Sequence, residues 1–345
     1  MKTDRQKGAQ AWRRLLLLLL LAAFAWLGLT RRAVVIATLS TLARGQWQWV
    51  TLALLLQVLF YLLYAGLYQA AFSAVDIKAR LLRLLPLLFS SVFINTVAPS
   101  LGASGAVLFV EDAASHGESP ARAAAAMVLV PVADATAFSV LLVAGMAYLF
   151  YQRSLHAYEV ASAVILLLLN LGLTLLLLLG LSRPGALQSL LHWLQQTVNT
   201  AWQRLRHRPL LAQGWAERNA SDFARAAQAI RDNGRSLLRA LGLAGAANLA
   251  NLASLYALFL AFHQPVAFGV LVAGFAIGVA LSLVAITPQG VGVVEGGMAL
   301  AYTSLGIPGP VAAAVVLGFR GLNVGLPVLA GFLLLRRNRL FARRR

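Results

Sequence analysis

The sequence contains no cysteine and few charged residues, and both absences restrict its function. Without cysteine, disulfides, thiolate chemistry and cysteine-based metal sites are excluded. Charged residues make up only 12% of the 345 residues, whereas a soluble protein has about 25%. Hydrophobic residues make up 60%, and apolar runs on the order of 20 residues recur along the chain. The composition therefore predicts an all-α, polytopic integral membrane protein.

The scarcity of acidic residues leaves a strongly basic chain, with 29 basic residues against 11 acidic ones and a formal charge of +18. In a soluble protein this balance would indicate nucleic acid. In a membrane protein, Lys and Arg mark cytoplasmic loops and attract anionic lipid headgroups, so we expect no nucleic-acid partner. The basic residues concentrate at the N-terminus, in 183–235 and at the C-terminus. We expect these three segments to be cytoplasmic and the protein to lie in the cell (inner) membrane.

Apolar segments of spanning length alternate with basic or polar connections. The first of them could be mistaken for a signal peptide, but we expect it to be retained as a helix. Ser119-Pro120 is a typical helix start, and Trp47 and Trp49 are typical of a membrane interface. The predicted full spans are Leu15–Leu29, Trp47 to about Phe72, Pro120–Tyr148, Val160–Leu181, Leu237–Phe262 and Pro310–Leu335.

Two further apolar stretches, 84–110 and 266–305, are interrupted near their middle by proline, glycine and small polar residues. Broken backbone at membrane depth is tolerated only where protein or water surrounds it. Three cytoplasmic segments require an even number of crossings in each half, so each stretch is predicted to be a re-entrant hairpin. The two hairpins would enter from opposite sides, as in transporters built from inverted repeats. The predicted organisation is an N-terminal membrane half 1–182, a basic cytoplasmic connector 183–235 with an interfacial helix, and a C-terminal membrane half 236–345.

Three charged residues, Asp134, Glu295 and Arg320, fall well inside apolar segments. Intramembrane charges usually pair with one another or line a wet cavity, so we expect Arg320 to pair with Glu295 or Asp134. Such a pair would bind a lipid headgroup or take up a proton. The alternative is a structural pair that only holds helices together.

The broken stretches indicate a second binding device. A helix that restarts after Pro99, or after Gly290 and Gly292, directs free backbone N–H groups and a positive dipole end towards the break, which suits a phosphate. The alternative is that the glycines only permit close packing, which we expect for Gly274 with Gly278 and for Gly321 with Gly325. No catalytic motif or metal-ligand spacing is present, so neither an enzyme nor a cofactor is expected. The candidate substrate-binding residues are Asn95, Thr96, Pro99, Gly102, Asp134, Pro288, Gly290, Gly292, Glu295 and Arg320.

Three motifs carry a family resemblance: Asn95-Thr96…Pro99…Gly102, then Pro288…Gly290…Gly292…Glu295-Gly296, then Arg320 with Pro327 and Gly331. Over about Leu15 to Leu335 the chain resembles the transmembrane region of lysylphosphatidylglycerol synthases, a flippase-like domain found alone or fused to a synthase. The resemblance implies movement of a lipid or lipid-linked headgroup between leaflets. The lipid would be an anionic or aminoacylated phospholipid, or a polyprenyl phosphate. The chain departs from the family at Pro131, near which the family often has an arginine ahead of the acidic residue matching Asp134.

Three functions follow from these observations. The first is a lipid flippase-like membrane protein, without aminoacyl transfer because no soluble synthase domain is seen. The second is a non-transporting accessory subunit that scaffolds a lipid or glycan synthase through the basic connector. The third is a proton-coupled transporter of small solutes.

Overall fold

The computed structural model describes residues 45–97, 103–151, 233–285 and 287–337, together with scattered residues between 164 and 228. The expected spans 15–29 and 160–181 and the connector 183–235 lie wholly or largely outside these residues. Over the four continuous ranges the elements are all helices, which confirms the all-α class.

Among the described residues, four helical segments are long and apolar enough to cross a membrane. They confirm the spans predicted from Trp47, Pro120, Leu237 and Pro310. The last one is a continuous rod made of three pieces, with a π-helical turn in the middle. The segments are α3 (Trp47–Ala74), α6 (Pro120–Tyr151), α10 (Gly234–Ala261), and the rod of α13 (Gly309–Arg320), η2 (Gly321–Gly325) and α14 (Leu326–Arg337).

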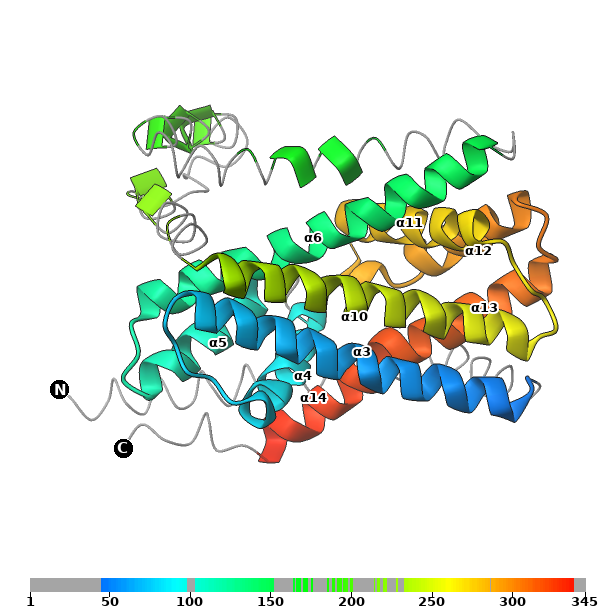
Figure 1. The fold of residues 1–345 in the computed structure, drawn as a ribbon, viewed down its shortest axis with the longest axis horizontal. Coiled ribbons are helices and arrows are strands. Elements are labelled where there is room, and N and C mark those ends of the chain that lie inside the picture. Colours follow the sequence, from blue (N-terminus) through cyan, green and yellow to red (C-terminus); the bar gives the residue numbers. More distant parts are fainter. Residues whose placement is uncertain are drawn as a thin grey trace.

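Helices α3 and α10 form an antiparallel pair through the centre of the molecule (Figure 1). Each has 28 residues, which corresponds to a length of about 42 Å. Hydrogen bonds close the pair at both ends. The Gln46 amide donates to the Ala261 carbonyl (2.9 Å), and the Asn233 side chain donates to the Ser73 carbonyl (3.4 Å). The start of α3 therefore lies beside the end of α10, and the end of α3 lies beside the start of α10.

The first interrupted stretch forms a helical hairpin of α4 (Leu81–Val97) and α5 (Ala103–Ser115). It follows the end of α3 after six residues and leads into α6 after four. The hairpin therefore opens at the end of the bundle where α3 finishes. Its tip contains residues 98–102, which are outside the described residues.

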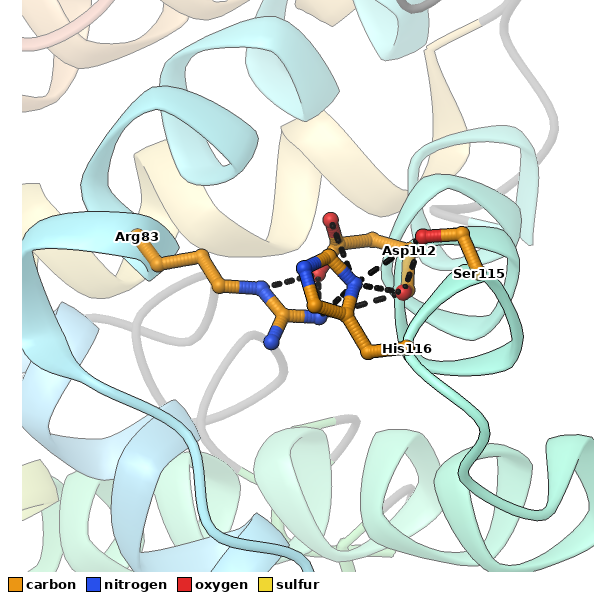
Figure 2. A network of polar contacts seen from close by, with 4 residues as sticks. All are labelled: Arg83, Asp112, Ser115 and His116. Carbon is orange, nitrogen blue, oxygen red and sulfur yellow. Dashed lines mark hydrogen bonds and ion pairs between the residues drawn. The ribbon is translucent and has the colours of Figure 1, made fainter.

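A polar network closes the open end of this hairpin (Figure 2). Arg83, in the first turn of α4, donates from Nε to the Asp112 carboxylate (2.7 Å) and from Nη2 to the Asp112 carbonyl (3.1 Å). Ser115 and His116 complete the network around the same carbonyl, at 2.7 and 2.8 Å. Because Arg83 lies in the first turn of α4 and Asp112 lies near the end of α5, these contacts hold the two arms together at their base.

The second interrupted stretch also forms a hairpin, with α11 (Phe268–Val284), the short turn η1 (Pro288–Gly290) and α12 (Val293–Ser304). Its arms are in close contact because glycines of α11 face large side chains of α12. A Cβ on Gly274 would overlap the Tyr302 ring, and one on Gly278 would overlap Met298. This confirms the packing role predicted for these two glycines. At Gly325 no such neighbour exists, because the nearest atom outside its own surroundings is the Arg320 carbonyl at 4.0 Å.

The two hairpins open at opposite ends of the α3–α10 pair and approach each other inside the bundle (Figure 1). The second hairpin follows the end of α10 after six residues, and its turn η1 contacts α4 of the first hairpin. The elements also recur at matching intervals. Helices α3 and α10 begin 187 residues apart, α4 and α11 also 187, and α6 and α13 189. Re-entry into a membrane and inverted repeats remain predictions.

Candidate functional site

Glu295 and Arg320 form an ion pair where the second hairpin meets the last span. Arg320 Nε donates to Glu295 Oε1 at 2.9 Å, and the two side chains are 12% and 16% exposed. Of the two partners expected for Arg320 from the sequence, the structure selects Glu295. Arg320 ends α13 and Glu295 lies in the first turn of α12, so the pair joins two helices that are neighbours in the chain.

The backbone between η1 and α12 is shaped to bring Glu295 to this place. Gly290 and Gly292 have positive φ angles of 67° and 89°, which glycine adopts without the penalty of a Cβ. Gln289 is also left-handed, with φ of 52°, and its carbonyl accepts a hydrogen bond of 2.5 Å from Arg320 Nη2. Arg320 thus holds both the turn and the carboxylate.

Glu295 also caps the start of α12. Its Oε2 accepts a hydrogen bond from the Gly292 backbone N–H at 2.5 Å, the glutamate half of a capping box. We expected the N–H groups exposed by this break to be free for a phosphate. The structure corrects this for Gly292, because its N–H is bound by a carboxylate of the protein itself. An anion is therefore already present at the helix start, and it belongs to the chain.

Arg320 is followed directly by the π-helical turn Gly321–Gly325. Such turns are rare and occur frequently at functional sites. Within this turn, Asn323 Nδ2 donates to Asn251 of α10 (3.0 Å), while the Asn323 carbonyl accepts from the Tyr61 hydroxyl of α3 (2.6 Å). The turn that carries the arginine is therefore bound to both central helices.

Asp134 lies apart from this ion pair, near the middle of the span Arg122–Tyr148. Its carboxylate accepts hydrogen bonds from Asn248 Nδ2 of α10 (2.8 Å) and from the Tyr64 hydroxyl of α3 (3.3 Å). None of the ion pairs among the described residues involves Asp134. Both of its partners are neutral donors.

Two polar residues expected at the site, Asn95 and Thr96, form hydrogen bonds within the first hairpin. Asn95 Oδ1 accepts from the Gly105 backbone N–H at 2.8 Å, which links α4 to α5 just below the tip. Thr96 is 5% exposed, and its hydroxyl donates to the Val92 carbonyl of its own helix at 2.7 Å. Pro99 and Gly102 lie outside the described residues. Pro288 begins η1, which contacts α4, so the two interrupted stretches of the chain come together.

Sequence reasoning missed five polar residues of the site. Each is a polar side chain inside an apolar span. Such residues are candidates for function, and extending the search from charged residues to amides and tyrosines would have found these five. The spacing within α3 and α10 is also informative, because residues three apart share a helix face. The missed residues are Tyr61, Tyr64, Asn248, Asn251 and Asn323.

Four apolar helical segments, two opposed hairpins and an enclosed ion pair define a multi-pass α-helical membrane protein. The chain belongs to the family of the lysylphosphatidylglycerol synthase transmembrane region, whose family model matches residues 9–331. Membership places it among membrane proteins of lipid metabolism or flippase type. A comparison with curated proteins found no match.

Proposed function

We propose that this protein is a lipid flippase, which moves a phospholipid or lipid-linked headgroup between leaflets and catalyses no covalent reaction. The observation that carries the proposal is the Glu295–Arg320 pair beside the turn η1. A guanidinium binds carboxylate and phosphate oxygens with the same fork of donors. A phosphate headgroup could therefore take the place that the Glu295 carboxylate holds on Arg320.

A buried amide in the same region supports a polar ligand. Gln57 of α3 is 3% exposed, and neither atom of its amide has a hydrogen-bond partner among the described residues. It lies one helical turn before Tyr61, on the face that contacts the last span. A buried polar group without a partner costs about 1–3 kcal/mol, and a headgroup could supply the missing hydrogen bonds.

We further propose that both hairpins are re-entrant and that the two halves are inverted repeats. The matching intervals between their helices support this, as does the opposite direction of the hairpins. Six described basic residues lie at the end of the bundle where the first hairpin opens, which supports a cytoplasmic location of that end by the positive-inside rule. They are Lys78, Arg80, Arg83, Arg122, Arg235 and Arg239.

Cysteine labelling provides the test of this topology, because the chain has no cysteine of its own. Ala114 and Thr303 are exposed residues near the open ends of the first and second hairpins. Cysteines that replace them are expected to react with a membrane-impermeant maleimide from opposite sides of the membrane. The parent protein serves as the unlabelled control, and reaction of both cysteines from one side would refute the opposed hairpins.

Lipid movement in proteoliposomes tests the function itself. Fluorescent zwitterionic, anionic and aminoacylated phospholipids and a polyprenyl phosphate would be compared in vesicles with and without the protein. We expect at least one phosphate-bearing lipid to cross at least tenfold faster than in protein-free vesicles. If none of them moves, and the protein instead purifies with a lipid or glycan synthase, the accessory-subunit function is correct.

A further inference from the structure

The matching intervals between the two halves also pair individual polar residues. A shift of 187 residues, which relates α3 to α10, matches Tyr61 with Asn248 and Tyr64 with Asn251. The shift of 189 residues that relates α6 to α13 matches Asp134 with Asn323.

The hydrogen bonds follow the same correspondence. Asp134 is bound by Tyr64 from α3 and by Asn248 from α10. Asn323 is bound by Asn251 from α10 and by Tyr61 from α3, which are the matched residues with the two helices exchanged. The bonds themselves differ, since Asn323 donates to Asn251 and the Tyr61 hydroxyl donates to the backbone carbonyl of Asn323, whereas Asp134 accepts both of its hydrogen bonds. The structure thus contains two related polar clusters, in which α6 and the π-helical turn η2 each bind both α3 and α10.

Charge distinguishes the two clusters. The residue on α6 is a carboxylic acid, whereas its match on the last span is an amide that cannot ionise. A charged side chain inside a membrane is costly without a partner, and the two donors to Asp134 are both neutral. Among the described residues no group of three or more His, Cys, Asp or Glu side chains gathers at Asp134 or elsewhere, so the surroundings give no indication of a metal site.

We propose that Asp134 is the proton-binding site that couples lipid movement to a proton gradient. The coupling rests on the proposed flippase function, whereas the proton site does not. The carboxylate takes up a proton from one side of the membrane and releases it to the other. The protonated form carries an O–H donor on one carboxyl oxygen, so the hydrogen bond that Tyr64 or Asn248 donates to that oxygen weakens or reverses its direction. Protonation therefore weakens the contact of α6 with the central pair, while the cluster at Asn323 has no carboxyl group that responds to pH.

The surroundings of Asp134 allow this assignment. Helix α11, which packs against α6, has no titratable residue, and Asp112 of α5 is held by Arg83. Tyr68 lies one turn from Tyr64 on the same face of α3, and its ring contacts that of Tyr64. The titratable groups on the elements packed around Asp134 are Tyr61, Tyr64 and Tyr68 of α3, Glu111 and Asp112 of α5, Arg122, Tyr148 and Tyr151 of α6, and Arg235, Arg239 and Tyr256 of α10.

The substitution Asp134→Asn tests the proton site directly. It places in the first cluster the residue type found at the matched position of the second, where an asparagine hydrogen-bonds to the same two helices, so we expect the protein to fold. Infrared difference spectra across a pH titration should show a protonated-carboxyl band in the parent protein that is absent from Asp134→Asn. Glu295→Gln is the matched control and should keep the band. A band that persists in Asp134→Asn overturns the proposal, as does loss of the band on adding sodium at constant pH.

A second variant keeps the test valid if Asp134→Asn does not fold. Asn248→Ala removes a donor to the carboxylate but leaves the acid, so the same band should persist to higher pH than in the parent protein. An unchanged titration would show that the band arises elsewhere and would overturn the proposal.

Transport then tests the coupling. In proteoliposomes with a pH gradient, lipid movement by the parent protein should be several-fold faster than without the gradient, and movement by Asp134→Asn should not respond to it. A gradient response that survives in Asp134→Asn overturns the coupling. Absence of any lipid movement refutes the proposed function, while the infrared titration still decides the proton site.

Discussion

Arg320→Ala is expected to cost about 3–5 kcal/mol of stability and to abolish lipid movement. The substitution leaves the Glu295 carboxylate, which is only 16% exposed, without its cation. It also removes the donor that holds the Gln289 carbonyl in the left-handed turn. The loss of stability is measured by unfolding the protein with increasing fractions of SDS in mixed micelles and monitoring the helix content by circular dichroism.

A double substitution separates stability from function. In Glu295→Gln with Arg320→Met the charges are removed together, while the glutamine oxygen still accepts the hydrogen bond from Gly292. Replacing a buried ion pair by uncharged groups is often neutral, so we expect the stability to return to within about 1–2 kcal/mol of the parent protein. Lipid movement should remain absent. If the double variant moves lipid at the parent rate, the pair is only structural.

Arg122→Ala is the matched control for the loss of a positive charge. Arg122 pairs with Glu118 at 3.6 Å on the surface, where the two side chains are 47% and 30% exposed. Such pairs contribute about 0–1 kcal/mol, so this variant should unfold close to the parent protein and move lipid normally. A large loss of stability or of lipid movement in Arg122→Ala would show that the measurements respond to the removal of any positive charge.

Gly331→Ala is expected to lower the stability by about 1–3 kcal/mol, the cost of overpacking a close-packed contact. A Cβ at this position would overlap the backbone carbonyl of Phe89 and would lie 2.9 Å from the Cβ of Phe93. The obstacle is therefore mostly backbone, which cannot turn away as a flexible side chain can. The only relief is a movement of α14 away from α4.

The same SDS titration measures this effect, with Gly242→Ala as the control. Gly242 lies in α10 with no atom within 4 Å of the added Cβ, so alanine should raise the stability by up to about 1 kcal/mol through its helix propensity. Equal unfolding of the two alanine variants would mean that α4 and α14 are not in contact at Gly331 in the membrane.

The sequence predicts the four described spans well because each is a long apolar run with interfacial or basic residues near its ends. The sequence also predicts the close packing at Gly274 and Gly278 and names Glu295 as one of two possible partners for Arg320. These features depend on local pattern or on the rule that membrane charges pair.

Other features depend on contacts between helices that are far apart in the sequence, and no local sequence pattern specifies those contacts. The two polar clusters arise because α3 and α10 are antiparallel and present Tyr64 and Asn248 to the same carboxylate. The bond from Gly292 to Glu295 was missed because residues three apart at a helix start were read as a free anion site. The π-helical turn after Arg320 has no recognisable signal in Gly321–Gly325 beyond its glycines.

The pairing of α3 with α10 has a consequence for synthesis. The two helices begin 187 residues apart, so at about 5–20 residues per second α10 emerges on the order of 10–40 s after α3. During that interval the polar face of α3 that carries Gln57 and Tyr61 also lacks the last span, which is made later still and whose Asn323 carbonyl accepts the hydrogen bond from the Tyr61 hydroxyl. Helices α4 and α6, which also contact α3, are made first. The nascent N-terminal half must therefore shield this polar face from lipid until the ribosome delivers its partner.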